Sequence, residues 1–150
     1  MDEQLHHSRV EDLDPAVLYA LLQLRVDVFV VEQECAYPEL DGRDLEPDAV
    51  LHWATDASGA VTGTLRVLRD ANGDARIGRV ATALAARGAG LAGRLMAAAL
   101  ASAPAGVDVV LDAQSHLADW YARFGFGVDG AEYVEDGIAH VPMRRRPDAP

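Results

Sequence analysis

Residues 76–106 read RIGRVATALAARGAGLAGRLMAAALASAPAG, and this stretch decides the fold. Its first part predicts a strand, because Ile77 and Val80 favour extended backbone. Its last part predicts a helix, because apolar residues recur at helical spacing from Leu91 to Leu100 without a helix breaker. Glycines lie at the junction, where a helix start offers unpaired N–H groups and a partial positive charge. We therefore expect residues 88–92 to form a cradle for phosphate.

The same glycines fit more than one phosphate motif. Residues 88–93 match G-x-G-x-x-G, and Asp112 follows about 20 residues later, as in a dinucleotide fingerprint. That interpretation is disfavoured, because residues 83–87 separate the glycines from their strand and too little chain follows for the remaining strand–helix units. The chain also lacks Gly-Lys-Ser/Thr, which a nucleoside-triphosphate loop requires. A glycine-rich helix start without a ligand is the remaining alternative.

Length, net charge and cysteine content limit the classes of protein to which the chain can belong. At 150 residues the chain has the length of one domain, residues 1–150, with a sizeable core. The net charge of −11 disfavours nucleic acid and anionic membranes as partners. Cys35 is the only cysteine, and neither a signal peptide nor a membrane-spanning segment is apparent. We expect a cytoplasmic protein without a metal site, since its histidines are scattered.

The remaining elements are expected on both sides of the central stretch. Strands are predicted at 4–10, 50–55, 60–68, 107–112, 132–135 and 138–143, and helices at 15–31 and 115–124, the second capped by Ser115. The order β-α-β-β-β-α-β-α-β-β predicts an α/β (α+β) fold with a mixed, mostly antiparallel central sheet and flanking helices. Residues 32–48 are interpreted as a solvated acidic loop, or alternatively as a loop that binds a cationic substrate. Residues 144–150 are expected to fray.

Two motifs resemble those of the GNAT acetyltransferases. Residues 87–92 contain R-x-x-G-x-A, which is similar to the pyrophosphate loop of that family. Residues 114–126 resemble the family pattern N-x-x-A-x-x-x-Y-x-x-x-G-F, with Gln114 in place of the usual asparagine. The flanks, residues 22–33 and 133–143, look like the ElaA-like branch. The resemblance implies a GNAT-type fold.

The resemblance also implies acetyl-CoA as the cofactor and a set of residues that hold it. Backbone N–H groups of residues 88–92 would bind the pyrophosphate, with the charge of Arg87 nearby. Backbone groups of Val80 and Thr82 would pair with the pantetheine arm like an added strand. The complete expected set is Val80, Thr82, Arg87, Gly88, Ala89, Gly90, Leu91, Ala92 and Gln114.

The implied reaction is direct attack of a neutral amine on the acetyl thioester. Tyr121 would protonate the leaving thiolate; the alternative is that its ring only fills the core. A base must also take the proton of the amine, and the candidates are Glu32, Glu34, His52, His116 and His140. We favour Glu32 and His140 as catalytic residues. Glu32, His52 and His140 are expected to line one acceptor pocket, although a structural role fits His52 equally well.

The acceptor is expected to be an amine of a small molecule or a peptide, and the protein a monomer or a homodimer. Two other functions fit the same features. A CoA-binding module without turnover would need the same cradle, and residues 25–30 also resemble the N-terminal helix of acyl-homoserine-lactone synthases. Release of thiol from acetyl-CoA in the presence of amines identifies the acetyltransferase. Dependence on acyl carrier protein identifies the lactone synthase.

Overall fold

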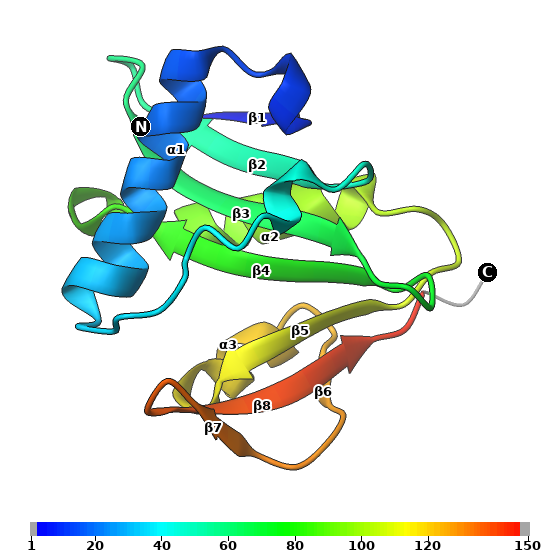
Figure 1. The fold of residues 1–150 in the computed structure, drawn as a ribbon. Coiled ribbons are helices and arrows are strands. Elements are labelled where there is room, and N and C mark those ends of the chain that lie inside the picture. Colours follow the sequence, from blue (N-terminus) through cyan, green and yellow to red (C-terminus); the bar gives the residue numbers. More distant parts are fainter. Residues whose placement is uncertain (1–2, 148–150) are drawn as a thin grey trace.

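The computed structural model describes residues 3–147, in which helices flank a single sheet (Figure 1). The strands are β1 (Gln4–Ser8), β2 (Val50–Thr55), β3 (Val61–Arg69), β4 (Ala75–Thr82), β5 (Val109–Gln114), β6 (Gly127–Val128), β7 (Tyr133–Glu135) and β8 (Ile138–Arg145). The helices are α1 (Pro15–Val26), α2 (Leu91–Ser102) and α3 (Ala118–Ala122), and a π-helical segment, Asp27–Glu32, continues α1. Short 3-10 turns occupy Val10–Asp12, Arg43–Leu45, Leu84–Ala86 and Ser115–Leu117.

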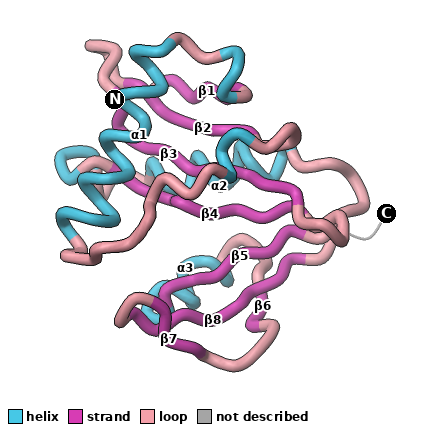
Figure 2. Tube along the Cα trace, viewed as in Figure 1, coloured by secondary structure: helices cyan, strands magenta, loops and turns pink. Residues whose placement is uncertain are grey.

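The described strands form an eight-stranded sheet in the order β1-β2-β3-β4-β5-β8-β6, with β7 also on β8 (Figure 2). Neighbouring strands are antiparallel except β4 and β5, which run parallel. The predicted mixed, mostly antiparallel sheet with flanking helices is therefore confirmed. The predicted order of elements holds apart from β6, which was missed because two residues are too few to carry a periodic pattern.

The helices cover both faces of the sheet, α1 on one face and α2 and α3 on the other (Figure 1). α2 buries the apolar residues that its spacing predicted, among them Leu91, Leu95 and Met96, in the larger core cluster. On the opposite face, Leu21 of α1 packs against Leu51 of β2. This packing of helices on both faces fixes the central strands, so that the strand ends and loops around them are held in place.

Two helix details differ from the prediction. The first helix was expected to remain α-helical to about Val31, but Asp27–Glu32 is π-helical, and the N–H of Cys35 bonds the carbonyl of Val30 beyond it. Such segments are rare and often lie at functional sites. The cap predicted at Ser115 is wrong, because the Oγ of Ser115 is buried and makes no hydrogen bond within residues 3–147.

The sheet opens between β4 and β5. These strands pair only through Ala75 with Val109 and Arg76 with Val110, and then separate toward their carboxyl ends (Figure 1). β4 also contains a bulge at which Arg79 has a φ of +53°, and a bulge bends and twists its strand. In open sheets with parallel strands, ligands bind beyond the carboxyl ends of those strands. A ligand-binding site is therefore expected in this opening.

The C-terminal strand is longer than expected. β8 continues through Arg145, so the expected fraying from residue 144 is wrong for Arg144 and Arg145. The same expectation for residues 148–150 lies outside the described residues. The Nη1 of Arg144 lies 2.9 Å from Asp74 Oδ2 and 2.8 Å from Asp108 Oδ2. Both carboxylates directly precede the paired residues of β4 and β5. Arg144 therefore holds together the closed end of the opening.

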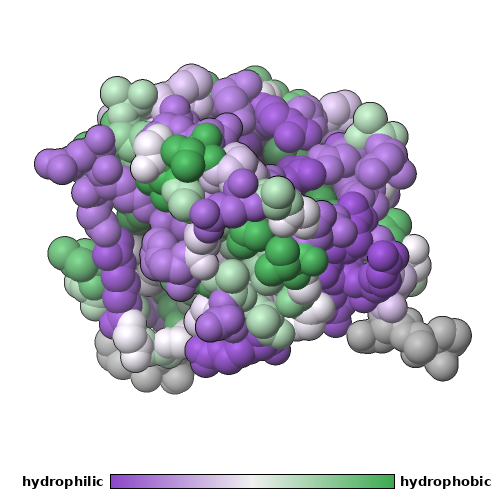
Figure 3. All heavy atoms as spheres, turned by 90° about the horizontal axis from the view of Figure 1, so that it is seen from below, coloured by the Kyte–Doolittle hydropathy of each residue, from purple (hydrophilic) through white to green (hydrophobic). Residues whose placement is uncertain are grey.

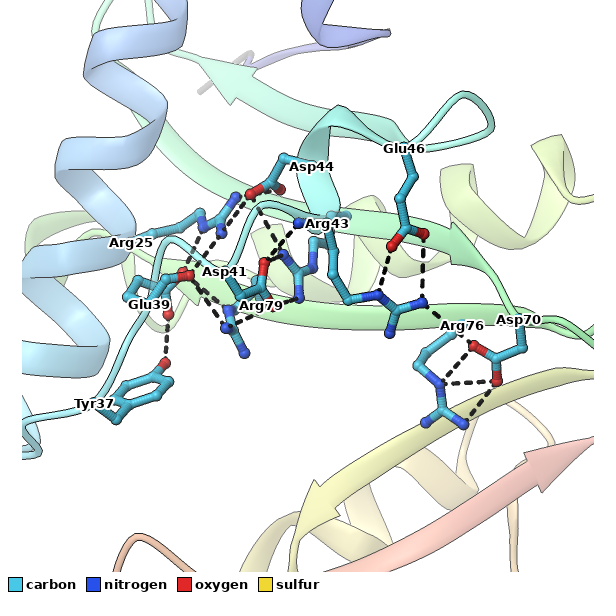
Figure 4. A network of polar contacts seen from close by, with 11 residues as sticks. Arg25, Tyr37, Glu39, Asp41, Arg43, Asp44, Glu46, Asp70, Arg76 and Arg79 are labelled. Carbon is cyan, nitrogen blue, oxygen red and sulfur yellow. Dashed lines mark hydrogen bonds and ion pairs between the residues drawn. The ribbon is translucent and has the colours of Figure 1, made fainter.

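The acidic loop that follows the π-helical segment is held by arginines (Figure 4). Arg25 of α1 is buried, with its Nε 2.7 Å from Glu39 Oε2 and its Nη1 2.7 Å from Asp44 Oδ1. Arg66 of β3 donates to both oxygens of Asp41, at 2.9 and 2.8 Å. The interpretation of this loop as simply solvated is thus wrong for these carboxylates, since each neutralises a guanidinium on the sheet or on α1. They are not available to a cationic substrate.

The same network reaches the bulge of β4. Glu39 also accepts a hydrogen bond from the Nε of Arg79, at 2.9 Å, and one from the hydroxyl of Tyr37. The guanidinium of Arg79 lies 5.4 Å from the centre of the Tyr37 ring, in a cation–π arrangement. The loop is therefore fastened to the strand that borders the opening.

The edge formed by β6 and β7 is partly apolar. Val128 of β6 is 62% exposed and Val134 of β7 is 71% exposed. On the face seen from below, hydrophobic residues lie mainly near the middle and hydrophilic residues lie around them (Figure 3). Scattered apolar residues of this kind are common on protein surfaces and by themselves indicate no partner.

Candidate active site

A cavity of about 1060 Å³ lies where β4 and β5 separate. Its walls come from the π-helical segment, β4, the glycine loop, the start of α2, the end of β5, α3 and the β7–β8 turn. The predicted site residues that line it are Glu32, Val80, Thr82, Arg87, Gly88, Gly90, Leu91, Ala92, Gln114, Tyr121 and His140. Ala89 and His52 do not line it.

The glycine loop leaves room for an anion. Gly88 and Gly90 have φ angles of +88° and +77°, a backbone conformation that residues with a Cβ disfavour. A Cβ on either glycine would meet no atom within 4 Å, so open space lies in front of both. α2 begins directly at Leu91, and no side chain caps its first turn. Free amides, a positive helix end and open space together suit a phosphate.

The end of β4 presents backbone groups toward β5 that β5 does not pair. The N–H of Ala83 donates to the carbonyl of Thr62 on β3, at 2.8 Å, so the groups of the alternate residues Thr82 and Val80 point to the other edge. β5 pairs with β4 no further than Arg76 and leaves that edge unpaired. The carbonyl of Thr82 accepts a hydrogen bond from the Nε of Arg87, at 3.0 Å. An extended ligand chain fits such an edge as an added strand.

Tyr121 lies at the inner wall of the cavity, on α3. Its side chain is 8% exposed, and its ring makes edge contacts with Trp120 and Phe126. Burial raises the pKa of Tyr121 to about 12, because the phenolate form loses its hydration. The hydroxyl therefore stays protonated at neutral pH and can donate a hydrogen bond.

His140 lies on β8, directly across from Gln114 of β5, and its ring stacks on Tyr133 of β7 at 5.7 Å. Its Nδ1 lies 2.8 Å from the carbonyl oxygen of Ile138. A carbonyl oxygen only accepts, so Nδ1 carries the proton and the Nε2 of the neutral ring keeps a lone pair. This tautomer is the one that a general base needs.

Of the three residues expected to line one acceptor pocket, Glu32 and His140 both line the cavity, whereas His52 does not. Glu32 ends the π-helical segment and forms a bidentate ion pair with Arg87, at 2.6 and 2.8 Å. His52 is buried in β2, where its ring stacks against His7 of β1 at 5.4 Å. The expectation that His52 shares a pocket with His140 is therefore wrong, and His52 has the structural role that its strand pattern also allowed.

Comparison with known proteins identifies the family. Residues 24–147 match the family described as acetyltransferase (GNAT) domain. The chain belongs to this family. A UPF0039 protein of Mycobacterium tuberculosis is 49% identical over 97% of this chain and 94% of its own length.

Two solved structures of similar proteins extend the comparison. An acyl-CoA N-acyltransferase from Pseudomonas aeruginosa is 42% identical, with a TM-score of 0.91 over 96% of this chain and 99% of its own. ElaA from Escherichia coli is 34% identical in the structural comparison, with a TM-score of 0.89 over 97% of this chain and 100% of its own. The resemblance to the ElaA-like branch and the GNAT fold are thereby confirmed, and the chain is a GNAT-type acyltransferase.

This GNAT site includes residues that the sequence analysis did not select. Arg79 and Tyr37 line the cavity, and so does Cys35, whose Sγ lies 3.6 Å from the carbonyl oxygen of Asp136 in the β7–β8 turn. Arg79 carried one signal, since it adjoins Val80 on the predicted cofactor strand. Tyr37 carried none, because the path of its loop depends on the ion pairs of Glu39 with distant arginines.

Two further observations on the GNAT domain concern metal binding and membrane-spanning helices. Within residues 3–147, no group of three or more histidine, cysteine or acidic side chains is arranged to bind a metal ion. The helices of that same range are all too short or too polar to cross a membrane.

Proposed function

We propose that this GNAT protein transfers an acetyl group from acetyl-CoA to an amine of a small molecule or a peptide. The observation that carries the proposal is the cavity itself, which joins an anion cradle at Gly88 and Gly90 to a basic imidazole at His140. The donor and the acceptor would meet between β4 and β5. We also propose a cytoplasmic location, because the single cysteine of the chain allows no internal disulfide.

The donor would lie along the free edge of β4. Amides of residues 88–92 and the start of α2 would hold its pyrophosphate. The outward-facing backbone groups of Val80 and Thr82 would pair with the amides of pantetheine, and Gln114 at the end of β5 would face them from across the opening. Because backbone groups would make most of these contacts, this binding mode requires no reactive side chain. A loop that consists largely of glycine and alanine is sufficient for it.

The acceptor would approach from the side of His140. The Nε2 of His140, directly or through a water, would take a proton as the amine nitrogen bonds the carbonyl carbon of the thioester. The C–S bond then breaks, and the thiolate leaves beside Tyr121. The raised pKa of Tyr121, about 12, keeps its hydroxyl protonated, so that it would donate a hydrogen bond to the sulfur and then a proton. Because an ordinary thiol, with a pKa of about 8.5, is the stronger acid, this transfer is uphill and the phenolate would regain its proton from solvent.

The test is release of free thiol from acetyl-CoA in the presence of a panel of primary amines. Turnover above the amine-free rate supports the transferase. A protein that acetyl-CoA stabilises but that releases no thiol with any amine is a binding module, and one stabilised equally by NAD has no specific cradle. Longer acyl-CoA donors in the same assay determine whether the acetyl group is preferred.

A further inference from the structure

The guanidinium of Arg87, at the wall of the cavity, is engaged on more than one side. Its Nη1 lies 2.8 Å from Glu32 Oε2 and its Nη2 lies 2.6 Å from Glu32 Oε1, so the end of the fork faces a carboxylate. Its Nε bonds the carbonyl of Thr82. A guanidinium makes paired hydrogen bonds along its Nη1–Nη2 edge or along its Nε–Nη2 edge. In Arg87 the first edge is used by Glu32, and the Nε of the second is used by Thr82. Hydrogen bonds from Arg87 also lower the pKa of Glu32, which is therefore ionised at neutral pH.

The position of this ion pair conflicts with the binding of a diphosphate. Arg87 directly precedes Gly88, so Glu32 places a negative charge at the loop where a diphosphate would rest. The other arginine of the β4 wall, Arg79, is engaged by Glu39 and Asp41 and offers no replacement charge. A diphosphate must either tolerate the carboxylate or displace it.

The segment that carries Glu32 crosses the mouth of the cavity. Gln33 contacts Gln114 at the end of β5, at 3.4 Å, and Cys35 contacts the carbonyl of Asp136 in the β7–β8 turn. Glu32 thus lies between the glycine loop and the part of the cavity wall that contains His140. A carboxylate released from Arg87 remains within the same cavity, close to the path of the acceptor.

We propose that Glu32 is the counter-ion that Arg87 exchanges for the diphosphate of the acyl donor, so that donor binding releases the Glu32 carboxylate to the acceptor. This inference rests on the proposed function and adds an order of binding to it. The released carboxylate attracts a cationic acceptor, which therefore binds after the donor. Its amine must give up one proton to solvent before the neutral nitrogen can attack the thioester. Because coupling between two sites is reciprocal, the bound amine also strengthens donor binding.

Calorimetric titration of CoA into the full chain tests the exchange. Glu32→Gln removes the competing charge and should lower the Kd for CoA about two- to fivefold, the range expected for an ion pair as exposed as this one. Glu34→Gln removes the same charge from the same segment but breaks no ion pair of Arg87, and should leave the Kd unchanged. In an Arg87→Gln background the effect of Glu32→Gln should disappear. The gain should also shrink at high salt.

The outcomes separate this inference from the function on which it rests. If Glu32→Gln weakens CoA binding, Glu32 positions Arg87 for the donor and the exchange is overturned. If Glu32→Gln and Glu34→Gln act alike, or if the effect persists without Arg87, the charge acts at long range and the exchange is again overturned, while CoA binding still supports the transferase. If wild type does not bind CoA, the proposed function itself fails.

Discussion

Arg25 and Glu39 form an ion pair inside the protein, with the Nε of the arginine 2.7 Å from a carboxylate oxygen and side-chain exposures of 1% and 2%. The same carboxylate accepts hydrogen bonds from Arg79 and Tyr37, both of which line the cavity. A charge buried in α1 is thus connected through one loop residue to the wall of the site. The energetics of that connection lead to the first prediction.

Arg25→Met should lower the free energy of unfolding by about 3–5 kcal/mol, because it leaves the carboxylates of Glu39 and Asp44 buried with less compensation. Urea denaturation measures the loss. The control is Arg9→Met, whose pair with Glu11 is about half exposed and should contribute less than 1 kcal/mol. Equal stability of the two variants would show that the buried network is not holding the loop.

Gly90→Asp should abolish the stabilisation of the fold by acetyl-CoA, which for wild type is about 2.7 kcal/mol at 100 times the Kd. The new carboxylate would occupy the open space in front of the loop and repel the phosphates. Denaturation with and without acetyl-CoA measures the effect. Gly59→Asp, at a β2–β3 turn position with a similar φ of +85° and similar open space, should keep the full shift. A ligand shift that survives in Gly90→Asp would place the diphosphate elsewhere.

Tyr121→Phe should reduce kcat by roughly 10²-fold or more and leave the Kd for acetyl-CoA nearly unchanged, because only the hydroxyl is lost from the packed ring. Since the pKa of Tyr121 is raised to about 12, ionisation of this group should cause no loss of wild-type activity below about pH 10. Tyr19→Phe, at a side chain that is 74% exposed, is the matched control. Unchanged turnover in Tyr121→Phe would leave this residue with packing alone.

His140→Gln should lower kcat or raise the KM for the amine without changing the Kd for acetyl-CoA. Its ring faces the acceptor side, and Nε2 keeps a lone pair in the tautomer that Ile138 selects. Steady-state kinetics and calorimetry separate the two constants. His7→Gln, on the exposed side of β1, should have no effect on either. If His140→Gln loses thermal stability and donor affinity together, His140 is structural and another group is the base.

His52 should make the protein less stable as the pH falls. Burial, and secondarily the charge of His7, lower the pKa of folded His52 to about 4 from 6.5, so between these values the unfolded chain binds a proton that the folded chain does not. Wild type should therefore lose about 2 kcal/mol of unfolding free energy from this residue between pH 7 and pH 5. His52→Gln should be less sensitive over that window. Parallel pH profiles of the two proteins would contradict the shift.

The features that the sequence predicted well are those that depend on neighbouring residues. Leu91, Leu95 and Met96 face the core because the helical repeat places them on one side, and Gly88 and Gly90 adopt backbone angles that their missing Cβ permits. Asp14 caps α1 through the N–H of Ala16, two residues away. Such patterns depend only on residues close together in the sequence, so the order of most elements and the conformation of the glycine loop follow from the sequence itself.

The partners of charged side chains were decided only by the tertiary structure. The ion pair of Glu32 with Arg87 was not indicated by the residues around either of them. His52 was expected in the pocket and stacks on His7, and Arg144 was expected in a frayed tail and joins Asp74 and Asp108. Local patterns determine the conformation of a segment and which of its faces is apolar. Which arginine meets which carboxylate depends on how strands far apart in the chain are brought together, and the divergence of β4 from β5 creates the cavity that the participating residues share.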